Sequence, residues 1–181
     1  MGSEYEVEKF VLRQFLPEEH VENVLDINPS KLKKRGIKAL VTDLDNTLIA
    51  WNKEKVTPEL VQWFSSLETA GISVMILSNN SEKRVKLFSN SSGVSYIFRA
   101  HKPLPFAFKR AMRLMKVQKD EMVVVGDQLL TDIWGANRVG VHTILVTPIV
   151  DSDGWATKLN RHLERFILSR LRHRGLLKWE D

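Results

Sequence analysis

The chain contains no cysteine among its 181 residues. This absence excludes a disulfide framework, a thiolate nucleophile and a zinc site built on thiolates. No stretch approaches the roughly 18 consecutive apolar residues of a membrane-spanning helix. The N-terminal sequence MGSEYEVEKF carries glutamates where a signal peptide would carry lysines. We therefore expect a protein that is neither exported nor threaded through a bilayer, with the cytoplasm as its default location.

Size and charge set further limits. Hydrophobic residues make up 43% of the chain and charged residues 27%, which suffices for one well-formed core and is small for two. A single domain over residues 1–181 is expected. The formal net charge of +5 favours an anionic partner or surface, although we expect no nucleic-acid partner.

Short apolar runs alternate with helical patterns through the middle of the chain. Two helices are predicted first, over residues 4–16 and 17–25, within an N-terminal helical segment of residues 1–36. Strands are then predicted over residues 37–42, 72–77, 94–98, 122–125 and 141–146, and helices over residues 58–70, 81–90, 105–116 and 129–138. This alternation is typical of βαβ units, and continuous apolar strands indicate a parallel sheet covered on both faces. The sequence therefore predicts a three-layer, Rossmann-like α/β fold with its core over residues 37–147.

Polar residues follow four of the predicted strands. In open parallel sheets, ligands bind at the carboxyl ends of the strands, so these residues should meet at one edge of the sheet. They are Asp43, Asp45, Asn46 and Thr47 after the first strand, Ser78, Asn79 and Asn80 after the second, His101 and Lys102 after the third, and Asp127 and Asp132 after the fourth. One edge thus collects acids, a hydroxyl group and an amine.

Two of these carboxylates, Asp43 and Asp45, stand only two residues apart and are costly to bury unless something offsets their repulsion. Carboxylates grouped with Asp127 suit a hard cation such as Mg²⁺, whereas a hydroxyl, a lysine and backbone N–H groups suit a phosphate. Asp43 could then attack phosphorus while Asp45 handles the proton of the leaving group and of the hydrolytic water. The pattern predicts phosphoryl-transfer chemistry.

Four motifs in the chain, DLDNTL, LSNN, HKP and GDQLLTD, resemble in the same order the motifs of the haloacid dehalogenase superfamily of phosphatases. Two longer segments, FLPEEHVENVLDINPSKLKKRGIKALVTDLDNTL and GDQLLTDIWGANRVG, resemble the YqeG family of subclass IIIA. That family is similar to the mitochondrial phosphatases that act on phosphatidylglycerophosphate. The resemblance therefore implies a Mg²⁺-dependent phosphomonoester hydrolase whose substrate is a lipid phosphate.

The resemblance also implies how the nucleophile and the metal are arranged. Asp43 would form an aspartyl-phosphate, and Asp45 would act as general acid and base. The metal would be bound by Asp43, by the backbone carbonyl of Asp45 and by Asp127. Thr47 would lie behind these ligands and support them.

The remaining implied roles concern the phosphate group. Ser78 and the backbone of Asn79 would hold the phosphoryl oxygens, and Lys102 would neutralise charge on the phosphate and on the nucleophile. Asp132 would orient Lys102 or a metal-bound water. Each assignment has a simpler alternative: Ser78 and Asn79 could cap the next helix, Lys102 could be a solvated lysine in a turn, and Asp132 could face solvent on a helix.

The spacing between motifs leaves no room for a cap domain. Residues 48–77 accommodate one turn, one helix and one strand, and residues 81–100 are filled in the same way. An uncapped site closes poorly on a metabolite but admits a phosphate displayed on a protein, a polymer end or a lipid headgroup. A phosphoprotein, a nucleotide or a sugar phosphate are alternative substrates. A catalytically silent binding module is an alternative of another class, and the intact acidic and lysine set argues against it.

The final predicted helix, over residues 155–174, is basic and amphipathic. Its apolar stripe consists of Trp155, Leu159, Leu163, Phe166, Ile167 and Leu171. The ordinary expectation is that this stripe packs on the sheet as the last helix of the fold. Its basic residues, with those of residues 31–38, could still make peripheral contact with an anionic membrane at its inner face.

Overall fold

The computed structural model describes the backbone of residues 2–150 and 155–177 and the side chains of residues 6–150 and 162–177. Within these residues, six parallel strands form one sheet in the order β1-β6-β5-β2-β3-β4. The strands are β1 (Glu19–Val21), β2 (Ala39–Thr42), β3 (Ser73–Leu77), β4 (Ser95–Ile97), β5 (Met122–Gly126) and β6 (His142–Val146). The prediction of a parallel α/β sheet is confirmed.

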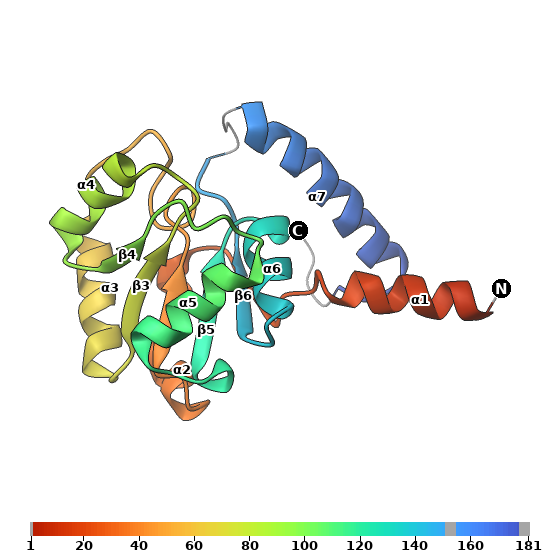
Figure 1. Ribbon diagram of the computed structural model, residues 1–181, viewed down its shortest axis with the longest axis horizontal. Helices are drawn as coiled ribbons and strands as arrows, with labels where there is room; N and C mark the ends of the chain where they lie inside the picture. The colour runs from red at the N-terminus through yellow and green to blue at the C-terminus, as the bar shows by residue number, and fades with distance from the viewer. Residues whose placement is uncertain (1, 151–154, 178–181) are drawn as a thin grey trace.

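Helices cover both faces of this sheet (Figure 1). Successive side chains of a strand point to opposite faces, so Leu40 and Val41 of β2 enter different apolar clusters. Leu40 packs with α3 (Pro58–Thr69) and α4 (Glu82–Ser92), whereas Val41 packs with α5 (Pro105–Met115) and α6 (Gly135–Asn137). The fold therefore has the three layers that the continuous apolar strands predict.

Of the two helices predicted in the N-terminal segment, the first is present and the second is not. Helix α1 (Gly2–Arg13) is present, but residues 17–25 are not helical. They form β1, which pairs with β6, followed by the 3-10 turn η1 (Val24–Asp26). Pairing with a strand more than a hundred residues away overrides the local helical preference. Helix α2 (Pro29–Lys34), which the side chain of Asn28 caps, was not predicted.

The segment predicted as a helix over residues 129–138 is also different. It forms a π-helical turn, η3 (Leu129–Trp134), which continues into the short α6. A second 3-10 turn, η2 (Lys119–Glu121), precedes β5. Single π-helical turns are frequent at functional sites, and Asp132 lies on this one.

The last helix, α7 (Trp155–His173), lies beside α1 and extends away from the sheet (Figure 1). Ile167 and Leu171 pack against α1 and η3, but Leu163 and Phe166 are 50% and 57% exposed. The expectation that the whole stripe packs on the sheet is therefore wrong, because among its described residues only Ile167 and Leu171 join the cluster that contains Leu145 of β6. The side chains of Trp155, Lys158, Leu159 and Arg161 lie outside the described residues.

Both segments in which a cap domain could be inserted are described in full. Residues 48–77 contain a loop, α3 and β3, and residues 81–100 contain α4 and β4. Neither therefore holds an additional domain. No helix within the described ranges combines the length and the hydropathy that a membrane span requires.

Candidate active site

Asp43, Lys102 and Asp132 meet at the carboxyl ends of β2 and β5. Lys102 Nζ lies 2.7 Å from Asp43 Oδ1 and 2.6 Å from Asp132 Oδ1, and all three side chains are buried. The alternatives of a solvated lysine and a solvent-facing aspartate are therefore wrong. Burial raises the pKa of Asp43 to about 6, although Lys102 opposes this rise. Burial alone would lower the pKa of Lys102, but Asp132 and Asp43 raise it above its usual value, so the amine stays charged.

Asp132 is held in place by the turn that carries it. Its second carboxylate oxygen accepts a hydrogen bond from Gln128 N at 3.1 Å. A Cβ atom at Gly126 would lie 2.2 Å from Asp132 Cγ, so a side chain at the end of β5 would displace the carboxylate. The glycine therefore permits η3 to fold back onto the strand and place Asp132 against Lys102.

Asp127 and Asp43 follow the adjacent strands β5 and β2. The register pairs Thr42 with Val125, and Asp43 N donates to Val125 O at 2.9 Å, so the two aspartates leave the sheet at the same edge. Thr47 Oγ1 donates to Asp127 Oδ1 at 3.0 Å, and both residues are buried. Neighbouring strands thus deliver two buried carboxylates, a donor type that suits a hard divalent cation.

Asp45 is bound by groups of the β3-to-α4 segment. Arg84 Nε and Nη2 donate to Asp45 Oδ1 at 2.9 and 2.7 Å, and Asn80 Nδ2 donates to Asp45 Oδ2 at 2.9 Å. The side chains of Arg84 and Asp45 are only 13% and 19% exposed. Sequence reasoning missed Arg84, because a basic residue in the first turn of a polar helix is ordinarily solvated; its one signal was its closeness to LSNN.

Ser78 and Asn79 occupy the loop after β3. Asn79 Nδ2 donates to Lys102 O at 3.0 Å, and Asn79 Oδ1 accepts from Lys102 N at 2.7 Å. Ser78 is buried, and its Oγ accepts from Asn80 N at 3.1 Å. The alternative that Ser78 or Asn79 caps α4 is wrong, since Ser81 is the cap. The Asn79 side chain instead fixes the backbone that presents Lys102.

A cavity of about 420 Å³ opens beside Lys102 and is also lined by Asn79, His101, Pro103 and Leu104. Every site residue predicted from the sequence follows β2, β3, β4 or β5 and so lies toward the carboxyl edge of the sheet. A phosphate can be bound here by a buried ammonium group together with hydroxyl and amide groups. A divalent cation can be bound by the two neighbouring carboxylates.

The comparisons with known sequences agree with this chemistry. The family model described as mitochondrial PGP phosphatase matches residues 9–151. The chain is 52% identical over 167 residues to "Probable phosphatase YqeG" of Bacillus subtilis, which covers 92% of this chain and 97% of that protein. It is 28% identical over 176 residues to phosphatidylglycerophosphate phosphatase 1, chloroplastic/mitochondrial, of Arabidopsis thaliana, which covers 91% of this chain and 50% of the plant protein. The chain thus spans about half the length of the plant relative.

Solved structures add a match of fold. A protein of Vibrio cholerae, provisionally assigned as a 3-deoxy-D-manno-octulosonate 8-phosphate phosphatase, superimposes with a TM-score of 0.51 at 16% identity, over 88% of this chain and 98% of that one. Identity this low supports the fold alone. The family model, however, covers most of the chain and includes all four motif positions. The chain belongs to the mitochondrial PGP phosphatase family, within the haloacid dehalogenase superfamily of phosphatases, as its motifs indicate.

Proposed function

We propose that this phosphatase hydrolyses a phosphate monoester through an aspartyl-phosphate on Asp43, with Mg²⁺ as cofactor and a phospholipid such as phosphatidylglycerophosphate as substrate. The observation that carries the proposal is the buried pair of Asp43 and Lys102 at the carboxyl end of β2. A lysine there places positive charge beside the nucleophile and the incoming phosphate. The name of the plant relative, a phosphatidylglycerophosphate phosphatase, supports the lipid substrate.

The oxygen donors at this edge fit Mg²⁺. Among the described residues no three His, Asp or Glu side chains converge into a metal cluster. In the proposed site the carboxylates of Asp43 and Asp127 and the backbone carbonyl of Asp45 would bind the cation. Mg²⁺ often takes few protein oxygens and keeps several waters. The raised pKa of Asp43 shows that nearby protein groups do not fully offset its buried charge. The cation would neutralise the negative charge of the Asp43 carboxylate and that of the bound phosphate.

The protein groups would divide the remaining work. Asp43 attacks phosphorus, and Ser78 Oγ and the backbone N–H of Asn79 bind the phosphoryl oxygens. Asp45 gives a proton to the leaving oxygen and later takes one from the water that hydrolyses the aspartyl-phosphate. Lys102 offsets the charge that develops on the phosphoryl group.

Residues that do not touch the phosphate would position those that do. Asp132 holds Lys102, and Thr47 holds Asp127, through the hydrogen bonds described above. The absence of an inserted domain in residues 48–77 and 81–100 leaves the edge open to a headgroup at a membrane surface, which favours a lipid over a small metabolite.

Removal of the metal tests the proposal most directly. Phosphate release from phosphatidylglycerophosphate in mixed micelles should fall about a hundredfold or more in EDTA and return with Mg²⁺. Ca²⁺ should support little turnover, because its looser coordination misplaces Asp43 relative to phosphorus. Full activity in EDTA would contradict the mechanism. If phosphate is released from a phosphopeptide, nucleotide or sugar phosphate but not from the lipid, the proposed mechanism is retained and the proposed substrate is wrong.

Arg84 is expected to position Asp45 for proton transfer. In Arg84→Gln, kcat/KM should fall about tenfold for glycerol phosphate, because its alkoxide leaving group must be protonated. It should fall by about twofold at most for p-nitrophenyl phosphate, because p-nitrophenolate leaves without protonation. The control is Arg110→Gln, which removes an exposed arginine of α5 and should change neither rate. Equal losses on both substrates would mean that Arg84 acts on the structure and not on the proton.

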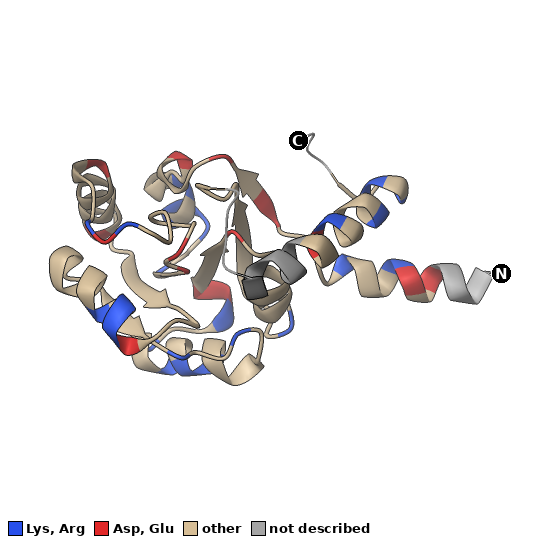
Figure 2. Ribbon diagram, turned by 90° about the horizontal axis from the view of Figure 1, so that it is seen from above, with Lys and Arg blue, Asp and Glu red and all other residues tan. Residues whose placement is uncertain are grey.

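The α1 and α7 helices offer a surface for membrane contact. Val7 and Phe10 of α1 and Leu163 and Phe166 of α7 are at least half exposed, and Figure 2 shows Lys and Arg along the described part of α7. Exposed apolar side chains among basic ones are typical of helices that bind anionic lipid. Residues 31–38 precede β2 and lie at the amino end of that strand, away from α7 (Figure 1). The proposed contact is therefore confined to α1 and α7.

Vesicle sedimentation checks this contact. The protein should bind vesicles rich in phosphatidylglycerol at low salt and dissociate as salt rises, since each basic residue near the surface contributes about 1 kcal/mol. Arg165→Gln with Arg172→Gln should weaken binding about tenfold or more. The matched control, Lys109→Gln with Arg110→Gln on α5, loses the same charge from another surface and should bind almost normally. Equal weakening in both double variants would indicate net charge alone and not a docking surface.

A further inference from the structure

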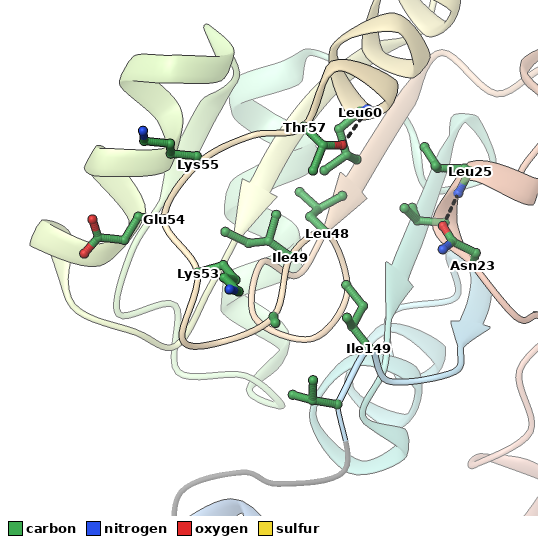
Figure 3. Close-up of a pocket in the computed structure, with 13 residues that line it drawn as sticks. Asn23, Leu25, Leu48, Ile49, Lys53, Glu54, Lys55, Thr57, Leu60 and Ile149 are labelled. Carbon is green, nitrogen blue, oxygen red and sulfur yellow. Dashed lines mark hydrogen bonds between the residues drawn. The ribbon is translucent and has the colours of Figure 1, made fainter.

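An apolar cavity of about 640 Å³ lies between the loop that joins β2 to α3 and the turn η1 (Figure 3). Its walls are mainly aliphatic and include Val24, Leu25, Leu48, Ile49, Leu60 and Ile149. This volume and lining are those of a small-molecule binding site. No step of the proposed hydrolysis uses the cavity.

The cavity wall is continuous with the segment that carries the nucleophile. Asn46 N donates to Ile49 O at 2.7 Å, and Ile149 N donates to Asn46 O at 3.0 Å. Two wall residues are thus bonded to the residue that follows Asp45. Ala50, also in the wall, accepts a hydrogen bond from Arg84 Nη2 at 3.5 Å. The loop that forms one wall of the cavity is therefore the loop that leads out of the segment carrying Asp43 and Asp45.

The rim of the cavity presents apolar surface to solvent. Leu25 is 39% exposed and Ile149 is 45% exposed, and covering such surface with an apolar group is favourable. Lys53 and Lys55 belong to the loop that lines the cavity, with Glu54 between them, so this rim carries net positive charge. An occupant with an apolar part joined to an anionic part matches both features.

We propose that the cavity binds an acyl chain of the phospholipid whose phosphate monoester is hydrolysed at Asp43. The inference rests on the lipid phosphatase function proposed above and adds how the lipid is recognised. A nucleotide or sugar phosphate would bring hydroxyl groups against aliphatic walls, where they would lose hydrogen bonds to water without replacement. An acyl chain loses none.

Two water-soluble substrates separate chain recognition from interfacial effects. One is phosphatidylglycerophosphate with two hexanoyl chains, kept below its micelle concentration, and the other is its deacylated headgroup. The wild-type ratio of kcat/KM, acylated over deacylated, should be about ten or more. Leu25→Glu and Ile149→Glu each place a charge at the rim and should lower the ratio about tenfold. Leu114→Glu, at an exposed leucine of α5 outside the cavity, is the control and should keep the wild-type ratio.

A second measurement does not depend on turnover. The metal-free protein is irradiated with phosphatidylglycerol that carries a diazirine at the end of one acyl chain, and the labelled peptides are identified by mass spectrometry. Label within residues 23–25 or 48–60 supports the proposal. Label confined to α1 and α7 would place the chains in the bilayer beside those helices and overturn it.

The outcomes distinguish this inference from the function on which it rests. If the rim variants keep the wild-type ratio while the wild type hydrolyses the lipid, the acyl site is overturned and the lipid phosphatase stands. If the wild type hydrolyses the headgroup as fast as the acylated substrate, the acyl site is again overturned. If it hydrolyses neither but releases phosphate from other monoesters, the lipid function fails and the acyl site fails with it.

Discussion

Replacement of Asp43 by Asn is expected to lower phosphate release by about five to six orders of magnitude. Asparagine keeps the size of the side chain but removes the attacking charge and one metal ligand together, and loss of the nucleophile costs a serine protease about a millionfold. The measurement is phosphate release by the purified variant with Mg²⁺. Asp120→Asn, which removes an exposed carboxylate of η2, is the control and should be fully active.

The same substitution is expected to raise the melting temperature of the metal-free protein. Burial raises the pKa of Asp43 to about 6, so the folded state disfavours the charged carboxylate at neutral pH. A neutral amide avoids that cost, and Lys102 retains its ion pair with Asp132. An inactive variant that is also unfolded would not identify the nucleophile. Activity retained by a folded variant, in a preparation free of other phosphatases, would contradict the aspartyl-phosphate mechanism.

The candidate site was predictable because its residues follow apolar strands, and strand order alone brings such residues to one edge. That rule needs no knowledge of side-chain contacts, so Asp43, Ser78, Lys102 and Asp127 could be identified without them. It does not predict how an individual side chain points. Asp132 could have faced solvent on a regular helix; only the π-helical turn and the bare backbone of Gly126 place it against Lys102.

The features that were missed depend on contacts distant in sequence. Residues 17–25 contain good helix formers, and only the edge of β6, about 125 positions later, makes β1 a strand. Arg84 belongs to the site because it binds Asp45, 39 residues earlier. No local sequence pattern predicts that pairing. The exposure of Leu163 and Phe166 was missed for the same reason, because amphipathic periodicity does not reveal which surface the helix meets.

Replacement of Lys102 by Met is expected to reduce turnover about a thousandfold and the free energy of unfolding by about 3–5 kcal/mol. Methionine keeps much of the length of the lysine stem but leaves Asp43 and Asp132 buried without their shared cation. Both effects follow from that change, since the phosphate loses a positive neighbour and two carboxylates lose their ion pair. Lys109→Met, at an exposed lysine of α5, is the matched control and should alter neither quantity appreciably.

The pH dependence of the Lys102→Met variant distinguishes loss of charge from loss of packing. A carboxyl group whose pKa is higher in the folded than in the unfolded state stabilises the fold fully below its unfolded pKa, and that contribution is lost as pH rises through the folded value. In the metal-free wild type, the stability should therefore fall as pH rises toward about 6 and change little through Asp43 at higher pH. Lys102 is the group that opposes the rise in this pKa, so its removal should raise the pKa further and extend the loss of stability toward pH 8. The free energy of unfolding is measured with urea between pH 5 and pH 8 in EDTA. If the difference in this free energy between variant and wild type is constant across that range, Lys102 stabilises the fold by packing and not by its charge.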